Sequence, residues 1–212
     1  MTPLPHPPLA VIADRFTDEE RADRAVAAVR AGARWVHLRD HAAHPEAFDT
    51  AARLLAQRLR DAAENVVVSV NTRLTTADSL DAGLHVGARG PSTAEARAAL
   101  GEEALIGYSA HEEGEATGDR AQESDYYFYS PVFATSSKPG AAPTGLSALQ
   151  SFCQVAAPTP VLALGGITPE RVSACQRAGA AGVAVLSGIM EADAPFVATQ
   201  AYLRALAPAS TQ

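Results

Sequence analysis

Short apolar segments alternate with longer amphipathic segments from residue 9 almost to the end of the chain. The apolar segments are rich in branched and aromatic residues and contain few polar ones, which is typical of parallel strands buried on both faces. The predicted strands are Leu9–Ala13, Trp35–Leu38, Val66–Val70, Leu84–Val86, Leu105–Ser109, Asp125–Tyr129, Val161–Leu164 and Val183–Leu186.

Helices are predicted between these strands, because apolar residues recur there every three or four positions. The segment around Gly114 and Gly118 is the weakest of them, since glycine disfavours a helix. The predicted helices span residues 17–30, 45–59, 74–81, 92–100, 112–120, 145–155, 169–179 and 194–206.

About eight strand-then-helix units predict an α/β protein, a single-domain (β/α)8 TIM barrel. Glycine follows a helix and precedes a strand in RAGARWVHL (30–38), DAGLHVG (81–87) and RAGAAGVAVL (177–186), where we expect it to form a left-handed helix cap. A doubly wound open sheet is the alternative, although no G-x-G-x-x-G follows the first strand. We expect a proline-rich arm over residues 1–8, the barrel over 9–206 and a frayed tail over 207–212.

Composition and charge narrow the class of partner. The 212 residues carry a net charge of −7 without a cluster of Lys and Arg, which argues against nucleic acid and against an anionic membrane surface. The start MTPLPHPPL does not resemble a secretory signal, so a cytoplasmic location is the default expectation. Cys153 and Cys175 lack the spacing of a zinc site or disulfide framework. A homodimer is an expectation from base rates alone.

Two glycine-containing loops follow the seventh and eighth predicted strands. In barrels the chemistry lies at the carboxyl ends of the strands, and these two loops commonly bind phosphate through backbone N–H groups. Gly165 and Gly166 follow the seventh strand, and Leu186 and Ser187 end the eighth. The sequence therefore predicts a phosphate site formed by these four residues; the alternative is that the glycines only form tight turns.

The stretch YYFYSPVFATSSKPG (126–140) begins as a buried strand that Pro131 ends, because proline has no N–H to donate. The loop that follows carries Thr135, Ser137 and Lys138. Hydroxyl groups and a cation are suited to an oxyanion such as phosphate. These residues are therefore candidates for substrate binding at the same end of the barrel as the two glycine-containing loops. The alternative is an ordinary solvated loop, which has the same composition.

Histidine and arginine side chains lie at the ends of other predicted strands. Arg39 is a candidate for a second anionic group, with a salt bridge to Asp40 or a neighbouring loop as the alternative. His37 lies on the same strand face and could carry protons near neutral pH, or it could simply fill a layer of the barrel. We expect His85 to be structural and His111 to cap a helix.

Five motifs occur in an order that identifies a family: GLHVG, GYSAH, SPVFATSSKPG, LALGGITPE and AGVAVLSGI. Together they resemble the thiamine phosphate synthase/TenI family of barrels over nearly the whole chain. The resemblance implies a thiazole phosphate at Gly166, Leu186 and Ser187, with Thr135 and Ser137 in the neighbouring loop. In the synthases a pyrimidine pyrophosphate lies opposite, at positions matching His37, Arg39, His41, Asn71 and Lys138, with Ser109 near the pyrimidine.

The chain departs from the synthase pattern at two positions that matter for metal binding. Thr72 and Gly90 stand where the family has aspartates, and those two carboxylates are the family's magnesium ligands. A hydroxyl and a glycine do not replace two hard anionic oxygens. We therefore predict no metal site and no cofactor, with Mg²⁺ required only if the synthase alternative holds.

The leading hypothesis from the sequence is a TenI-like enzyme that moves a proton on a small phosphorylated substrate, a thiazole phosphate, without a metal. The candidate catalytic residues are His37, His111 and Lys138, because the TenI histidine after the sixth strand matches Pro131 here. The first alternative is a thiamine phosphate synthase that joins hydroxymethylpyrimidine pyrophosphate to thiazole phosphate. The second is a non-catalytic phosphate-binding or regulatory protein.

Overall fold

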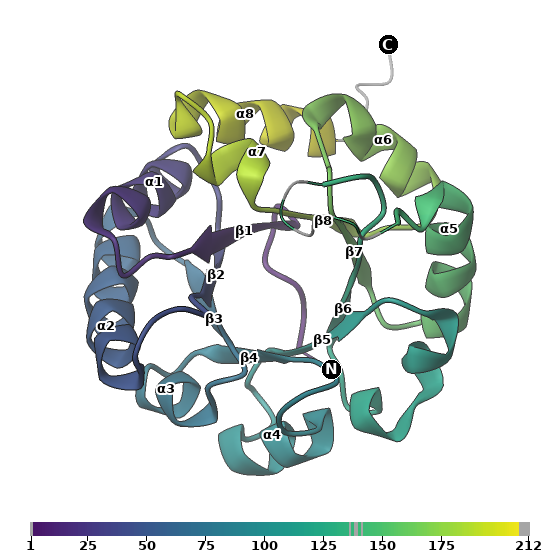
Figure 1. The fold of residues 1–212 in the computed structure, drawn as a ribbon, viewed down its shortest axis with the longest axis horizontal. Coiled ribbons are helices and arrows are strands. Elements are labelled where there is room, and N and C mark those ends of the chain that lie inside the picture. Colours follow the sequence, from purple (N-terminus) through teal and green to yellow (C-terminus); the bar gives the residue numbers. More distant parts are fainter. Residues whose placement is uncertain (1, 136, 138–139, 141, 208–212) are drawn as a thin grey trace.

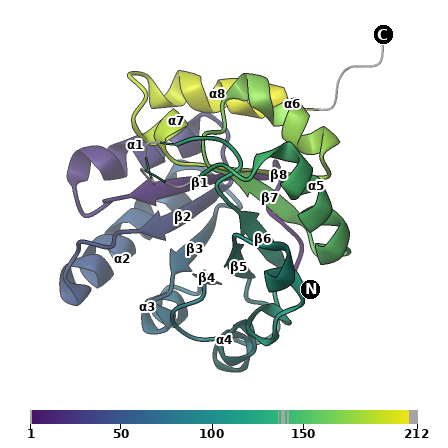
Figure 2. The ribbon, with the colours of Figure 1, turned by 45° about the vertical axis from the view of Figure 1, so that its right-hand side comes forward.

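Eight parallel strands form a closed barrel in the computed structural model, which describes residues 2–135, 137, 140 and 142–207. Each strand pairs with the next in sequence, and β1 pairs with β8 to close the ring. The helices surround the strands as an outer layer (Figures 1 and 2). The chain is therefore a single-domain (β/α)8 TIM barrel, as predicted, and the doubly wound alternative is wrong.

The elements follow one another in the order expected for this fold. The strands are β1 (Leu9–Asp14), β2 (Trp35–Arg39), β3 (Val67–Asn71), β4 (Gly83–Val86), β5 (Ile106–Ala110), β6 (Tyr126–Tyr129), β7 (Val161–Leu164) and β8 (Gly182–Val185). The helices are α1 (Glu19–Arg30), α2 (Pro45–Ala62), α3 (Leu74–Ser79), α4 (Thr93–Leu100), η1 (Glu113–Thr117), η2 (Asp119–Ala121), α5 (Gly145–Ala156), α6 (Pro169–Arg177), α7 (Ser187–Met190) and α8 (Pro195–Leu206).

Alternate residues of each strand face two separate apolar cores. One core fills the space between strands and helices, and the other fills the barrel interior with large side chains such as Ile12, Trp35, Tyr126 and Phe128. The rings of Trp35 and Tyr126 meet edge to face, with centroids 4.7 Å apart. The interior is therefore a packed core, as in other barrels of this type.

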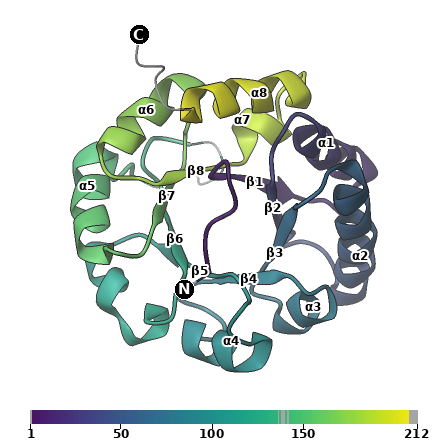
Figure 3. The same ribbon diagram turned by 180° about the vertical axis from the view of Figure 1, so that it is seen from behind.

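The N-terminal arm crosses the end of the barrel at which the strands begin (Figure 3). The backbone N–H of Thr2 donates to Asp125 Oδ1 over 2.7 Å, and Leu4 packs against the interior core. The other carboxylate oxygen of Asp125 accepts from Arg97 and from the backbone N–H of Ile106. This buried cluster fixes the arm to the barrel. The arm therefore covers the end at which the strands begin, and the opposite end, where active sites of such barrels lie, stays uncovered by it.

One predicted helix is wrong, and one short helix of the structure was not predicted. The helix predicted over residues 112–120 is instead two short 3₁₀ helices, η1 and η2, in the region of the helix-disfavouring Gly114 and Gly118. Helix α7 was not predicted, because four residues are too few for a recognisable apolar period.

Two other predicted details also differ from the structure. The strand β1 runs one residue beyond its predicted end, to Asp14. Gly83 is not a left-handed cap: it begins β4, and Asp81 adopts the positive φ of 48° instead. Across the described part of the chain, no helix is long and apolar enough to cross a membrane.

Candidate active site

The loop after β7 brings two glycines close to the loop after β6. Gly165 and Gly166 both have positive φ angles, of 96° and 61°. A Cβ atom at Gly166 would lie only 2.3 Å from the carbonyl oxygen of Ala134, and one at Gly165 would lie 2.8 Å from Pro131. Glycine is needed at both positions because the two loops approach each other so closely.

The loop after β8 lies beside these glycines. Leu186 precedes the short helix α7, which begins at Ser187, and the first N–H groups of a helix have no partner within it. The Tyr202 hydroxyl of α8 donates to the carbonyl oxygen of Ile167 over 2.8 Å. A Cβ at Gly188 would lie 2.0 Å from the same hydroxyl, so Tyr202 packs directly against the backbone of α7, where only glycine fits.

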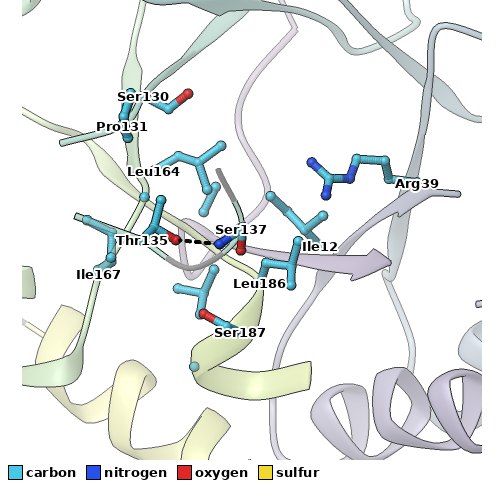
Figure 4. A pocket seen from close by; sticks show the side chains of 15 residues that line it. Ile12, Arg39, Ser130, Pro131, Thr135, Ser137, Leu164, Ile167, Leu186 and Ser187 are labelled. Carbon is cyan, nitrogen blue, oxygen red and sulfur yellow. Dashed lines mark hydrogen bonds between the residues drawn. The ribbon is translucent and has the colours of Figure 1, made fainter. Parts of the chain in front are cut away.

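A pocket lies between the loops after β6, β7 and β8 (Figure 4). It is lined by backbone and side-chain groups from all three loops and by Ile12 of β1. The guanidinium group of Arg171 stacks on Phe133 at 4.5 Å and donates to the carbonyl oxygen of Gly166, which fastens the β6 loop over the β7 loop. The predicted site residues that line this pocket are Arg39, Thr135, Ser137, Gly165, Gly166, Leu186 and Ser187.

Arg39 reaches the pocket from the end of β2, where an unpredicted partner holds it. Its Nε–H donates to Oδ1 of Asp14, at the end of β1, over 3.0 Å. Asp40 is not that partner, because it accepts from Thr17 and from backbone N–H groups of the next loop. The ion pair with Asp14 orients the guanidinium of Arg39. Its remaining N–H groups can then donate to an anion in the pocket.

His37 is buried in the barrel and does not line the pocket. Its Nδ1 lies 3.0 Å from Ser69 Oγ, and only 2% of its surface is exposed. Burial, with a smaller effect of the positive charge of Arg39, lowers the pKa of His37 to about 3. The imidazole is therefore neutral at pH 7, which argues against a role as proton carrier and favours the structural alternative for this residue.

His85 and Ser109 lie side by side, near the end of the barrel at which the strands finish. The Nδ1 of His85 lies 3.0 Å from the Tyr126 hydroxyl, and its Nε2 lies 2.8 Å from Ser109 Oγ. Burial lowers the pKa of His85 well below its ordinary value. Ser109 and Asn71 remain partly exposed at the ends of β5 and β3. His85 is structural in the sense predicted, and Ser109 is anchored to it.

The other two candidate histidines lie farther out. His41 is exposed beyond β2, and partial desolvation, followed by the charge of Arg39, lowers its pKa. The ring of His111 lies 2.6 Å from the carbonyl oxygen of Ser130, to which Nδ1–H donates. His111 does not cap a helix as predicted, because Glu112 occupies that position before η1. Lys138 lies outside the described residues.

The residues present do not fit the magnesium ion of the synthases. A Cβ at Gly90 would lie 3.9 Å from the Cβ of Thr72, so the positions of the two missing carboxylates are neighbours. Gly90 has a φ of 107°, and Arg120 donates to its carbonyl oxygen, which adds positive charge. Within the described ranges, no three His, Cys, Asp or Glu side chains are grouped to hold a metal ion. Hard divalent cations require several oxygen ligands, and Thr72 and Gly90 do not supply the two carboxylates of the synthases.

Three residues that shape the pocket were not among the predicted site residues. Asp14 could have been found by extending the first strand by one residue to its polar end. Ser130 lines the pocket immediately before Pro131 and offers its carbonyl oxygen to His111. Tyr202 carries no signal in the sequence, because its partner Ile167 is 35 residues away.

Comparison with known proteins gives one family. The sequence model described as thiamine monophosphate synthase matches residues 9–189. A thiamine-phosphate synthase of Chloroflexus aurantiacus is 37% identical over 203 residues, which cover 93% of this chain and 91% of that protein. A thiamine-phosphate synthase of Syntrophomonas wolfei is 38% identical over 167 residues, which cover 78% of each chain.

Solved structures agree with this assignment. A thiamine phosphate pyrophosphorylase from Pyrococcus furiosus has a TM-score of 0.81 at 26% identity and covers 93% of this chain and 94% of its own. A thiamine phosphate pyrophosphorylase from Bacteroides thetaiotaomicron, with a TM-score of 0.65 at 19% identity over 93% of this chain and 94% of its own, supports the fold alone. The chain therefore belongs to the thiamine monophosphate synthase family, a family of enzymes.

Proposed function

We propose that the pocket between the loops after β6, β7 and β8 binds the phosphate group of a thiazole phosphate. The observation that carries this proposal is the convergence of seven residues, predicted from the sequence, on one pocket. Backbone N–H groups at glycines and at the start of α7 can surround phosphate oxygens. Membership of the thiamine monophosphate synthase family supports the identity of the ligand.

We propose further that the reaction is the transfer suggested by the names of the relatives, which are thiamine-phosphate synthases. In this reaction the bond between the pyrimidine methylene carbon and a pyrophosphate oxygen breaks, and pyrophosphate leaves with the electron pair. The thiazole nitrogen then forms a new bond to the same carbon. Arg39, directed by Asp14, would stabilise the negative charge of the phosphate groups.

The tautomerase hypothesis, which led the sequence analysis, has less support. Of its three candidate proton carriers, Lys138 lies outside the described residues, and His37 is buried and neutral. His111 does not line the pocket and donates Nδ1–H to a backbone carbonyl. Pro131 occupies the position of the TenI histidine. The transfer reaction needs no such proton carrier, and it is therefore the better proposal.

Calorimetric titration with thiazole phosphate and with hydroxymethylpyrimidine pyrophosphate, each with and without Mg²⁺, tests the proposal. We expect thiazole phosphate to bind equally well in EDTA, because its pocket contains no metal ligand. Release of pyrophosphate in the presence of both substrates would support the transfer. Proton exchange on the thiazole without coupling would restore the tautomerase hypothesis, and binding without either reaction would indicate a binding protein.

The variant Gly166→Ala is expected to weaken binding of thiazole phosphate by about tenfold or more, which corresponds to about 1.4 kcal/mol. The new methyl group would lie 2.3 Å from the carbonyl oxygen of Ala134 and would push the β6 loop away from the β7 loop. Gly101→Ala is the matched control, since Gly101 also has a positive φ, of 86°, but no atom within 4 Å of the added Cβ. Equal effects of the two variants on affinity would contradict the proposed site.

A further inference from the structure

The residue that follows β1 has an unusual backbone conformation. Arg15 has a φ of 54°, in the left-handed region that side chains other than glycine rarely adopt. Its N–H donates to the carbonyl oxygen of Arg39 over 3.1 Å, and its own carbonyl oxygen accepts from the N–H of Asp18 over 3.0 Å. The conformation is therefore fixed on both sides, by the pairing of β1 with β2 and by the turn that leads to α1.

Strain of this kind is found at the end of the barrel that holds the phosphate pocket. Among the described non-glycine residues with a positive φ, Asn65 and Asp81 precede β3 and β4, and their residue types tolerate this conformation. Arg15 and Thr72 are of types that tolerate it poorly, and they directly follow β1 and β3. Strained residues cluster at functional sites, which makes Arg15 a candidate for a role in binding.

The turn at Arg15 changes where its side chain lies. In β1, Ile12 faces the barrel interior, and a continued extended strand would direct Arg15 outward. Phe16 occupies the outer core instead, where its ring packs against Phe48 with centroids 4.9 Å apart. The side chain of Arg15 returns toward the preceding residue, and its Nε lies 3.6 Å from Oδ2 of Asp14.

Asp14 therefore holds two guanidinium groups, one at each carboxylate oxygen. Arg39 donates Nε–H to Oδ1 over 3.0 Å and lines the phosphate pocket (Figure 4). Arg15 lies beside Oδ2, and its side chain is 56% exposed. Asp40, the next carboxylate, accepts from Thr17 and from backbone N–H groups instead. Two positive charges thus share one carboxylate, and one of them is left to attract an anion.

We propose that Arg15 and Arg39 form a guanidinium pair that binds pyrophosphate, and that Asp14 positions both groups. Pyrophosphate consists of two phosphate units joined by an oxygen, and each unit can accept hydrogen bonds from one guanidinium. The pocket for a single phosphate is lined by Arg39 but not by Arg15, so a longer anion is needed to reach both. This assignment rests on the proposed function, in which pyrophosphate is the leaving group.

The guanidinium pair supplies positive charge in a chain that lacks the carboxylates of the synthase metal site. Thr72 and Gly90 stand at those positions. Departure of pyrophosphate is favoured by positive groups placed at its oxygens, and arginine can provide them in phosphate chemistry. Arg15 adds a second such group to Arg39, and we expect the pair to bind pyrophosphate without a metal.

A surface arginine that only pairs with its neighbour is the simpler alternative. It would explain the contact with Asp14, but it gives no reason for a long side chain at a strained position. Glycine would form the same turn without strain. The two interpretations differ in what the loss of the Arg15 side chain does to anion binding and to stability.

Calorimetric titration with inorganic pyrophosphate in EDTA tests the pair. We expect Arg15→Gln to lower the affinity for pyrophosphate about tenfold and to change the affinity for thiazole phosphate less than twofold. Arg15→Lys keeps the charge but loses the forked geometry, so a smaller loss of about threefold is expected. Arg58→Gln is the matched control, because it removes the same charge from an arginine that also pairs with an aspartate at the surface, Asp23.

The variant Arg15→Gly separates binding from structure. We expect its urea midpoint of unfolding to equal or exceed that of the wild type, because glycine adopts the positive φ without strain. Its affinity for pyrophosphate should nevertheless fall about tenfold. A lower midpoint together with unchanged affinity would show that Arg15 serves only the fold.

The outcomes separate this inference from the proposed function. Equal pyrophosphate affinities of the wild type and Arg15→Gln would overturn the guanidinium pair and leave the proposed transfer intact. A loss of affinity for thiazole phosphate instead would overturn the assignment to pyrophosphate, and wild-type binding that requires Mg²⁺ would overturn metal-free binding. If the wild type binds no pyrophosphate with or without Mg²⁺, both the pair and the proposed transfer are wrong.

Discussion

Replacement of Asp125 by asparagine is expected to lower the free energy of unfolding by about 3–5 kcal/mol. Asp125 is 1% exposed, and its carboxylate accepts from the backbone N–H of Thr2, the backbone N–H of Ile106 and the guanidinium of Arg97. Asparagine has nearly the same shape but offers one acceptor oxygen instead of two and carries no charge. The charge of Arg97, whose side chain is only 9% exposed, would therefore lose its anionic partner.

Urea-induced unfolding of both proteins, compared at the same pH, measures this difference. The control is Asp23→Asn, because Asp23 forms an ion pair with Arg58 on the surface, where the aspartate side chain is 61% exposed. Exposed pairs of this kind contribute about 0–1 kcal/mol. Similar losses in the two variants would contradict the view that the buried cluster beneath the barrel anchors the N-terminal arm.

The fold could be predicted from the sequence because its signals are local and repeated. Apolar segments without polar alternation mark strands buried on both faces, and in this chain the pattern recurs for every strand of the barrel. The same regularity explains why the residues of the phosphate loops could be placed. Once the strands are known, Gly166 and Ser187 must lie at the same end of the barrel, because parallel strands finish there.

The properties that the sequence did not predict depend on contacts between distant segments. The partner of Arg39 is Asp14, which is 25 residues away in sequence and is set by the register of β1 and β2. The protonation of His37 depends on how completely the barrel interior excludes water, which no motif encodes. For the same reason, the sequence alone leaves His37 open between a proton carrier and a structural residue, whereas its buried environment keeps it neutral.

The departure from the synthase pattern at residues 72 and 90 involves more than two side chains. At a φ of 107°, Gly90 has a backbone conformation that an aspartate would adopt only with strain, and its carbonyl oxygen is bonded by Arg120. A single substitution would therefore not restore a carboxylate pair without a change in the loop. This is why the proposed transfer relies on the guanidinium of Arg39 and not on a metal held at residues 72 and 90.

Acid is expected to destabilise the chain, with His37 alone contributing a loss of about 2–3 kcal/mol between neutral pH and pH 4.5. In the unfolded chain both histidines bind a proton near pH 6.5, whereas in the folded chain His37 does so only near pH 3, and the pKa of His85 is also far below its ordinary value. The unfolded state therefore binds more protons below pH 6.5. The stabilisation is complete above that pH and, for His37, is lost at about 1.4 kcal/mol per pH unit as the pH falls toward 3.

Urea unfolding at a series of pH values from 7 to 4.5 measures this dependence, and His37→Gln identifies its source. Glutamine can still bond Ser69 but does not titrate, so we expect the pH slope of the unfolding free energy to fall by about 1.4 kcal/mol per pH unit between pH 6.5 and 4.5. His44→Gln is the control, because His44 is exposed before α2 and makes no capping bond with its side chain. If His37→Gln kept the full slope, protonation of the barrel interior would not be what limits stability in acid. A reduced slope would show that the burial of a neutral His37 imidazole in the barrel interior lowers the stability of the chain in acid.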